Sequence, residues 1–132
     1  MSWVDVFAVF VVSHLVGDYM LQTEWEAVNK RGGLSGPPVA RRALLSHIAT
    51  YTLAFVPGLV WLWTDDKAWV FALAVVIAFP HMVQDDGRLL AAYARRFKKA
   101  DIQRDALLGH ALDQAFHVLA LFLTALLARA LS

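Results

Sequence analysis

Three pairs of aspartate and histidine lie four residues apart in otherwise apolar stretches of the sequence. The pairs are His14 with Asp18, His81 with Asp85, and Asp113 with His117. A step of four residues places both side chains on one face of an α-helix. Imidazole nitrogens and carboxylate oxygens are ligands that Zn, Fe and Mn accept in proteins. The spacing therefore indicates a binding site for a divalent transition metal, built from arms on several helices.

Four apolar segments carry or flank these residues. A hydrocarbon core of ~30 Å takes ~20 residues of helix to cross, and the segments cover residues 3–22, 43–63, 68–85 and 106–131. Hydrophobic residues make up 59% of the 132-residue chain and charged residues 17%, against about 45–50% and about 25% in soluble domains. We predict an all-α integral membrane protein, a four-transmembrane-helix bundle that forms one domain over residues 1–132.

Basic residues are distributed unevenly among the connecting segments. Residues 23–42 and 86–105 carry most of the Lys and Arg side chains, whereas the turn at residues 64–67 holds one lysine beside two aspartates. By the positive-inside rule, the two basic connections face the cytoplasm and both termini face outside. Tryptophans that flank residues 64–67 fit the opposite membrane interface.

Two short helices are predicted within the basic connections. The stretch TEWEAVNK begins with Thr23 and Glu26 at the spacing of a capping box. The stretch RLLAAYARRFKK, residues 88–99, places apolar side chains on one stripe and basic side chains elsewhere. We expect both to lie as amphipathic helices on the cytoplasmic membrane surface, with plain solvated connectors as the alternative.

The order within the three pairs indicates that they converge. Histidine precedes aspartate in segments 3–22 and 68–85 and follows it in segment 106–131, which runs in the opposite direction. Each aspartate is then nearer the cytoplasm, with its histidine ~6 Å deeper. His47 follows Arg42 by one to two turns and belongs to the same half of the bilayer. An ionisable group inside a membrane costs ~2.5–3.5 kcal/mol, so these side chains should contact one another and not lipid.

The predicted metal ligands share this depth and are His14, Asp18, His47, His81, Asp85, Asp113 and His117. They outnumber the three or four protein ligands of one zinc site, so one or two ions fit, with Zn preferred over Fe or Mn. Polar neighbours expected to support the ligands by hydrogen bonds are Gln22, Gln84, Gln114 and His110. Hydrogen bonds between histidine and aspartate without a metal are the alternative interpretation.

A buried metal with a nearby carboxylate is typical of hydrolases. Asp85 is the predicted catalytic base, because it follows Pro80 and lies nearest the cytoplasmic mouth of its segment. We expect a metal-dependent hydrolase that acts on a lipid-like ester, amide or phosphate from the cytoplasmic half of the bilayer. A metal redox enzyme is a variant of this class. The alternatives are a non-enzymatic structural or phage-accessory membrane module stapled by metal, and a transporter of metal ions or protons.

The amino-acid composition limits the kinds of ligand and partner that the protein can have. The absence of cysteine excludes disulfides and thiolate ligands, and a net charge of +1 with no nucleic-acid module argues against a nucleic-acid partner. Membrane lipids are the expected partners, and the sequence leaves homo-oligomer formation open.

Four stretches carry a resemblance to a known family: SHLVGDYMLQ, LLSHIATYTLAF, FPHMVQDD and LDQAFHVLALFL. In this order, over nearly the whole chain, the sequence resembles the bacterial and phage membrane proteins of the DUF3307 family, whose activity is unassigned. The resemblance implies a multi-pass protein of the bacterial inner (cytoplasmic) membrane. It also implies a shared site at His14, Asp18, Gln22, His47, His81, Asp85, Asp113, Gln114 and His117. His110 lies outside the family pattern.

Overall fold

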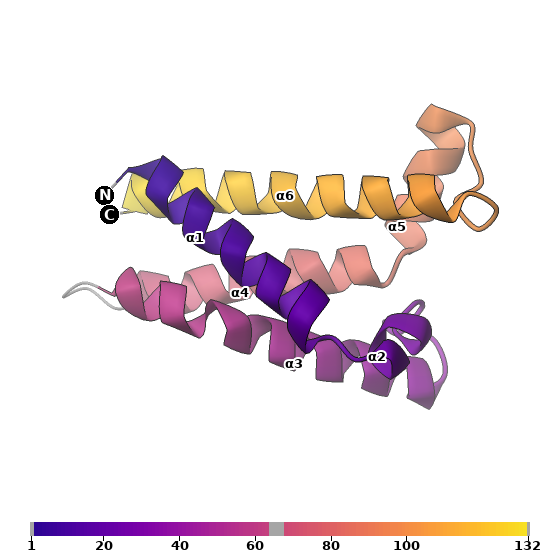
Figure 1. The fold of residues 1–132 in the computed structure, drawn as a ribbon, viewed down its shortest axis with the longest axis horizontal. Coiled ribbons are helices and arrows are strands. Elements are labelled where there is room, and N and C mark those ends of the chain that lie inside the picture. The colour runs from indigo at the N-terminus through magenta and orange to yellow at the C-terminus, as the bar shows by residue number, and fades with distance from the viewer. Residues whose placement is uncertain (1, 64–67, 132) are drawn as a thin grey trace.

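Four long helices form a bundle in the computed structural model, which describes residues 2–63 and 68–131. They are α1 (Trp3–Leu15) with its continuation η1 (Val16–Leu21), α3 (Pro38–Trp61), α4 (Ala68–Asp85) and α6 (Ala106–Leu131). Figure 1 shows both termini at one end of the bundle and the short helices at the other. The predicted all-α fold is confirmed, while the turn expected at residues 64–67 lies outside the described residues.

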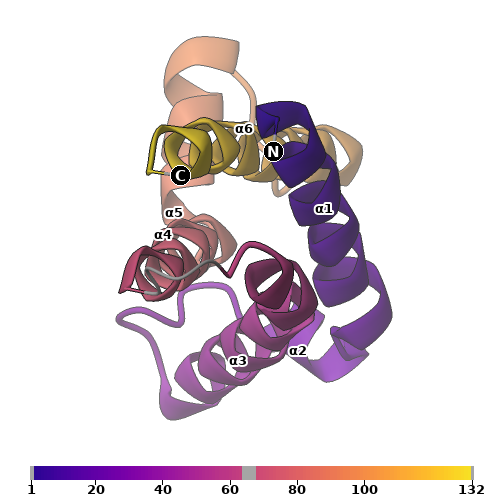
Figure 2. The same cartoon turned by 90° about the vertical axis from the view of Figure 1, so that its left-hand side faces the viewer.

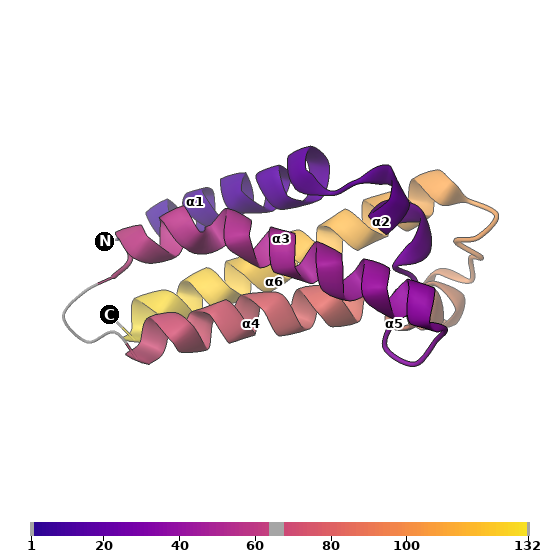
Figure 3. The same cartoon turned by 90° about the horizontal axis from the view of Figure 1, so that it is seen from below.

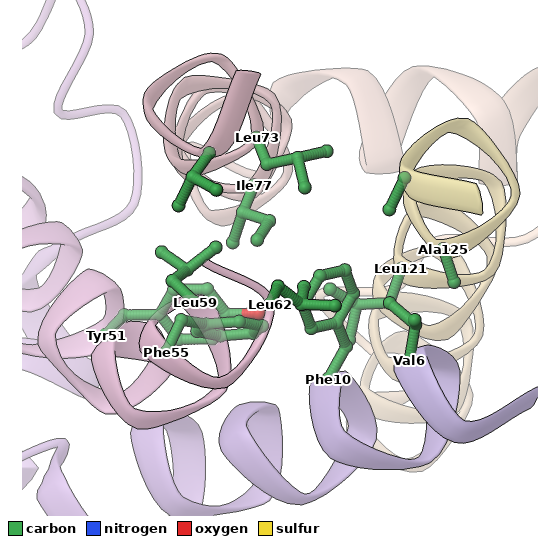
Figure 4. Packing of buried hydrophobic residues seen from close by; sticks show 12 residues of the cluster. Val6, Phe10, Tyr51, Phe55, Leu59, Leu62, Leu73, Ile77, Leu121 and Ala125 are labelled. Atoms are coloured by element: carbon green, nitrogen blue, oxygen red, sulfur yellow. The ribbon is translucent and has the colours of Figure 1, made fainter. Parts of the chain in front are cut away.

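The helices are arranged as a ring. Helix α1 packs against α3 and α6, and α4 packs against the same two helices, as the view along the bundle shows (Figure 2). Apolar side chains fill the half of the ring nearer the termini (Figure 4), and they are Val6, Phe10, Tyr51, Phe55, Leu59, Leu62, Val70, Leu73, Ile77, Leu121, Ala125 and Ala128. The buried histidines and aspartates lie in the other half, between this apolar cluster and the short helices.

The outer surface of the bundle is also apolar. Leu53, Phe71 and Val75 point outward with 64–65% of their surface exposed. Three helices of the described chain are long and apolar enough to cross a membrane. Helix α4 and the helix after it, which meet at a bend of 59°, make a fourth candidate if the two are counted as one span. So much exposed apolar surface is unusual for a soluble monomer.

Helix α3 begins at Pro38, earlier than the predicted segment beginning at Ala43. Proline is favoured in the first turn of a helix, where its missing N–H has no intrahelical partner to lose. The basic pair Arg41 and Arg42 is therefore part of the first turns of α3 and not of the loop before it. Helix α4 runs through Pro80 as one helix.

Short helices occur where the sequence predicted them (Figure 3). Helix α2 (Glu24–Asn29) has the predicted capping box: Thr23 Oγ1 accepts from the Glu26 N–H at 3.2 Å, and the Glu26 carboxylate accepts from the Thr23 N–H at 2.9 Å. Helix α5 (Arg88–Tyr93) and its continuation η2 (Ala94–Lys98) follow α4. Their position at a membrane surface stays a prediction.

The first connection, the segment between η1 and α3 that contains α2, forms hydrogen bonds to the bundle at two places. The hydroxyl of Ser46 on α3 donates to Glu26 Oε1 at 2.6 Å. Asp86, just after α4, accepts from the Leu34 N–H through its carboxylate and from the Gly32 N–H through its carbonyl, both at 2.9 Å. The chain between these anchors is therefore held against the ends of α3 and α4.

The Glu26 anchor predicts a pH-dependent stability. Burial by itself would raise the pKa of Glu26, but hydrogen bonds from Ser46 and Thr23 outweigh it and hold the pKa below its usual value. Because the pKa of Glu26 is depressed in the folded state, the ionised carboxylate stabilises the fold fully above its ordinary pKa of about 4.3. This stabilisation is lost as the pH falls from that value through the lower pKa of the folded state. We expect Glu26→Gln to lower Tm at neutral pH, with a gap to wild type that closes in acid.

Thermal unfolding in detergent across this pH range measures the effect. Glu24→Gln is the matched control, because Glu24 is exposed on the same helix and should leave Tm unchanged. A Glu26→Gln gap that is the same at neutral and acid pH would contradict the prediction.

Candidate metal centre

Two imidazoles and two carboxylates meet at one point inside the bundle. The Nε2 atoms of His47 and His81 lie 3.1 Å apart. Asp18 Oδ1 lies 3.2 and 3.3 Å from these two nitrogens, and Asp85 Oδ2 lies 3.0 and 3.1 Å from them. None of the four side chains is more than 7% exposed. Three elements, η1, α3 and α4, therefore deliver four ligand atoms to a buried position.

The distances between these atoms have the size that a tetrahedral metal site requires. Ligands that hold zinc at about 2.0 Å in a tetrahedron lie about 3.3 Å from one another. The five measured distances run from 3.0 to 3.3 Å. Small shifts of side chains would admit an ion, so Asp18, His47, His81 and Asp85 can hold a metal.

Hydrogen bonds alone do not satisfy this cluster. His47 Nε2 faces His81 Nε2, both carboxylates and, at 2.9 Å, Gln22 Nε2, yet a ring nitrogen carries at most one hydrogen. The amide nitrogen of Gln22 is a donor, so with Gln22 in this orientation the His47 Nε2 presents a lone pair to it. Asp18 Oδ1 is buried without a hydrogen-bond donor in the described part of the chain. A cation would satisfy these converging lone pairs.

Asp85 also belongs to a second group, with Asp113 and His117 of α6, whose ligand atoms all lie within 4.8 Å of one another. His117 Nδ1 donates to the Asp113 carbonyl at 2.7 Å, which leaves the lone pair on Nε2. That Nε2 is buried, has no hydrogen-bond partner among residues 2–63 and 68–131, and lies 3.6 Å from Asp85 Oδ1. Asp85 thus presents one oxygen to each group.

The two groups include every predicted ligand except His14. Both nitrogens of His14 have other partners: Nδ1 lies 3.1 Å from the Tyr51 hydroxyl, and Nε2 lies 3.0 Å from Gln114 Oε1. Its ring stacks against that of His117 with centroids 5.3 Å apart. In this arrangement His14 holds its neighbours in place, and its role as a ligand stays a prediction.

Two of the predicted supporting amides contact the ligands directly. Gln22 Nε2 lies 2.9 Å from His47 Nε2, although Gln22 follows the last turn of η1 and has an extended backbone. Gln114 Nε2 donates weakly to Asp18 Oδ2 at 3.5 Å and to Asp113 Oδ2 at 3.4 Å. Gln114 therefore connects the carboxylates of the two groups.

The other two predicted neighbours lie farther out. Gln84 donates to the Phe116 carbonyl at 3.1 Å and so ties α4 to α6. His110 is exposed, and its Nε2 lies 3.1 Å from the hydroxyl of Tyr19 at the rim of the site. Neither side chain offers an atom to the two ligand groups.

Lys30 also belongs to the site, although its place in the sequence indicates only a charge in a loop. Its Nζ donates to Asp85 Oδ2 at 2.8 Å, and its side chain is 12% exposed. The anchors at Glu26 and Asp86 hold this stretch of chain over the end of α4. A single lysine before a glycine-rich stretch has no spacing signal that points to Asp85, so only the folded chain identifies it.

A close approach between η1 and α3 positions Asp18. A Cβ atom on Gly17 would lie 2.6 Å from Tyr51 Cδ2 and 3.3 Å from Tyr51 Cα. The Tyr51 ring lies flat on the His81 ring, with centroids 3.4 Å apart and planes at 7°. Asp18 follows Gly17 in the wider π-helical turn of η1, and such turns are frequent at functional sites.

A polar pocket of about 280 Å³ gives access to the centre from the end that carries α2 and α5. Asp18, Asp85 and Asp113 line it together with Lys30 and Arg31. Asp113 is the most accessible of the three carboxylates, with 22% of its side chain exposed, against 7% for Asp18 and 1% for Asp85. The second ligand group is therefore the one that a molecule in the pocket would meet.

Fold and site together define an all-helical protein with a buried histidine–aspartate centre between four apolar helices. The family model described as "Protein of unknown function (DUF3307)" matches residues 6–132, nearly the whole chain. The chain belongs to this family, which confirms the resemblance seen in the sequence. No curated protein matches the chain, and no solved structure matches it.

The contact at Gly17 yields a prediction. Gly17→Ala should push Tyr51 away and disturb His81 and Asp18, so we expect a destabilisation of about 1–3 kcal/mol together with loss of bound metal. The matched control is Gly58→Ala, whose Cβ would lie 2.7 Å from the Val9 Cγ1 methyl group in the same pair of helices, away from the ligands.

Thermal unfolding and metal content are measured on the same samples. Gly58→Ala should lower Tm while it keeps its metal. Equal metal content in the two variants would show that the Gly17 contact does not position the ligands.

Proposed function

We propose that the chain is a multi-pass protein of the bacterial inner membrane, with four spans and both termini outside. The apolar outward-facing side chains and the lengths of the helices support membrane insertion. The connections that contain Lys30 and Arg95 lie at the same end of the bundle, and the bias of Lys and Arg toward this end supports a cytoplasmic location for it.

We further propose that the buried centre binds divalent transition metal, with zinc preferred and Asp85 as a ligand shared between two ions. The observation that carries this proposal is the set of 3.0–3.3 Å distances among Asp18, His47, His81 and Asp85. Charge supports it as well. The side chains of Asp18, Asp85 and Asp113 are 7%, 1% and 22% exposed, Lys30 contacts Asp85, and a divalent ion would balance the remaining negative charge inside an apolar bundle.

The activity that we propose is hydrolysis of a lipid-like substrate. The first group has four protein ligands, a closed set, whereas Asp85, Asp113 and His117 leave a position open for a fourth ligand. A metal in such a site lowers the pKa of bound water to about 7 and polarises an ester or phosphate. The open position borders the polar pocket, where Lys30 can stabilise negative charge that develops on a substrate.

This proposal changes the role of Asp85. The sequence suggested a free carboxylate that acts as a base, but in the structure both oxygens of Asp85 face ligand atoms, and Oδ2 also accepts from Lys30. We therefore propose Asp85 as the shared ligand. The alternative of a free base remains testable, because a base can be replaced without loss of metal.

A structural role for the metal is the second candidate. The closed set of four ligands in the first group is typical of structural zinc sites. A metal bound there would hold η1, α3 and α4 together. A transporter receives less support, because apolar side chains of the cluster from Val6 to Ala128 fill the bundle beyond the histidines.

The topology can be tested with single cysteines, since the chain has none of its own. We expect Lys67→Cys and Arg95→Cys to react with a membrane-impermeant maleimide from opposite sides of sealed vesicles, Arg95→Cys from the cytoplasmic side. Reaction of both from one side would contradict the proposed topology.

Metal content tests the centre. Protein purified without chelator should contain zinc, and we expect His81→Ala to lose the ion of the first group and His117→Ala that of the second. Asp85→Asn should lower both. His110→Ala is the control that should keep the full content, because His110 lies in neither group.

Activity is measured on the same samples against a panel of lipid esters and phosphates. If Asp85→Asn keeps its metal and loses turnover, Asp85 is the base and not the shared ligand. A metal-replete wild type that hydrolyses none of the panel would contradict the hydrolase proposal and favour the structural one.

A further inference from the structure

An apolar groove of about 420 Å³ lies on the side of the bundle between α4, α5 and α6. Its apolar walls are formed by Phe79, Pro80, Val83, Leu89, Leu90, Tyr93 and Phe116. Phe79 and Leu89 are 60% and 65% exposed, so the groove opens to the outer surface that faces lipid in the proposed topology. Its size falls within the range of about 300–1,000 Å³ that is usual for small-molecule sites.

The groove adjoins the polar pocket over the metal centre. Gln84, Leu90 and Asp113 line both cavities. Asp113 is also a member of the second ligand group. A single amphiphilic molecule can therefore lie with its chain in the groove and its polar end beside the open ligand position.

Charge indicates what that polar end is. Lys30 and Arg31 line the pocket, and two divalent ions would outweigh the charge of its three carboxylates. A phosphate group complements such a set of cations. The buried Oε1 of Gln84 has no hydrogen-bond partner in the described part of the chain, and it is an acceptor for a hydroxyl on the same head group.

We propose that the groove and the polar pocket together bind one membrane phospholipid with an anionic, phosphate-bearing head group and one acyl chain in the groove. The inference rests on the proposed metal centre, because without metal the carboxylates repel an anion. It identifies phosphatidic acid as the simplest probe and phosphatidylcholine, whose head group has no net charge, as the reference lipid.

Native mass spectrometry of the full-length, zinc-loaded protein in non-ionic detergent measures binding of the two lipids. Val83→Trp fills the groove and should weaken binding of both lipids about tenfold, because the indole displaces roughly two chain methylenes. Val75→Trp is the matched control on the same helix, outside the groove. Arg31→Gln should reduce the preference for phosphatidic acid about threefold, as expected for an exposed charge, with Lys98→Gln as control.

Metal content is determined for every variant, and Leu89→Trp at the exposed rim replaces Val83→Trp if that variant loses its metal. Binding by the groove variants equal to that of Val75→Trp would overturn the proposal. Equal affinity of the wild type for both lipids would also overturn it. The proposal would fail as well if inorganic phosphate displaced phosphatidic acid while the groove variants bound the lipid as well as wild type. Selective binding of phosphatidic acid without hydrolysis contradicts only the proposed activity. Hydrolysis that is unchanged by Val83→Trp and Leu89→Trp contradicts only the proposed role of the groove in lipid binding.

Discussion

Burial of the Asp18 and Asp85 carboxylates among apolar helices is the constraint on which the rest of this structure depends. Asp18 and Asp85 are nearly inaccessible, and removal of such groups from water costs several kcal/mol each unless positive charge or hydrogen bonds replace the lost solvation. Lys30 supplies one positive charge through its contact with Asp85. The imidazoles of His47 and His81 bring nitrogens to the same point, so the bundle holds four side chains in an arrangement that can accept a metal ion.

This constraint accounts for features outside the centre. The first connection is bound to α3 through Glu26 and to the end of α4 through Asp86, and between these anchors Lys30 reaches Asp85. Gly17 removes the side chain that would separate η1 from Tyr51, and Tyr51 in turn supports the ring of His81. The first connection and Gly17 thus take part in positioning the ligands together with the helices that carry them.

The sequence predicted the helices well because their signals are local. Long apolar runs identify α1, α3, α4 and α6, and the Thr23–Glu26 spacing identifies α2. The reversed order of the His and Asp pairs also pointed to their convergence. The start of α3 at Pro38 was missed because Arg41 and Arg42 suggested a loop. The position of His14, the contact of Lys30 and the π-helical turn depend on contacts between distant segments, and a helical step of four cannot reveal them.

The distribution of ligands along the chain has a consequence for biogenesis. Asp18, His47, His81 and Asp85 all precede α6, so the first group is encoded completely before the ribosome reaches the final helix. Asp113 and His117 are added only when α6 joins α1 and α4. All four residues of the first group therefore precede α6 in the chain, and the group that borders the polar pocket is completed only by the last helix.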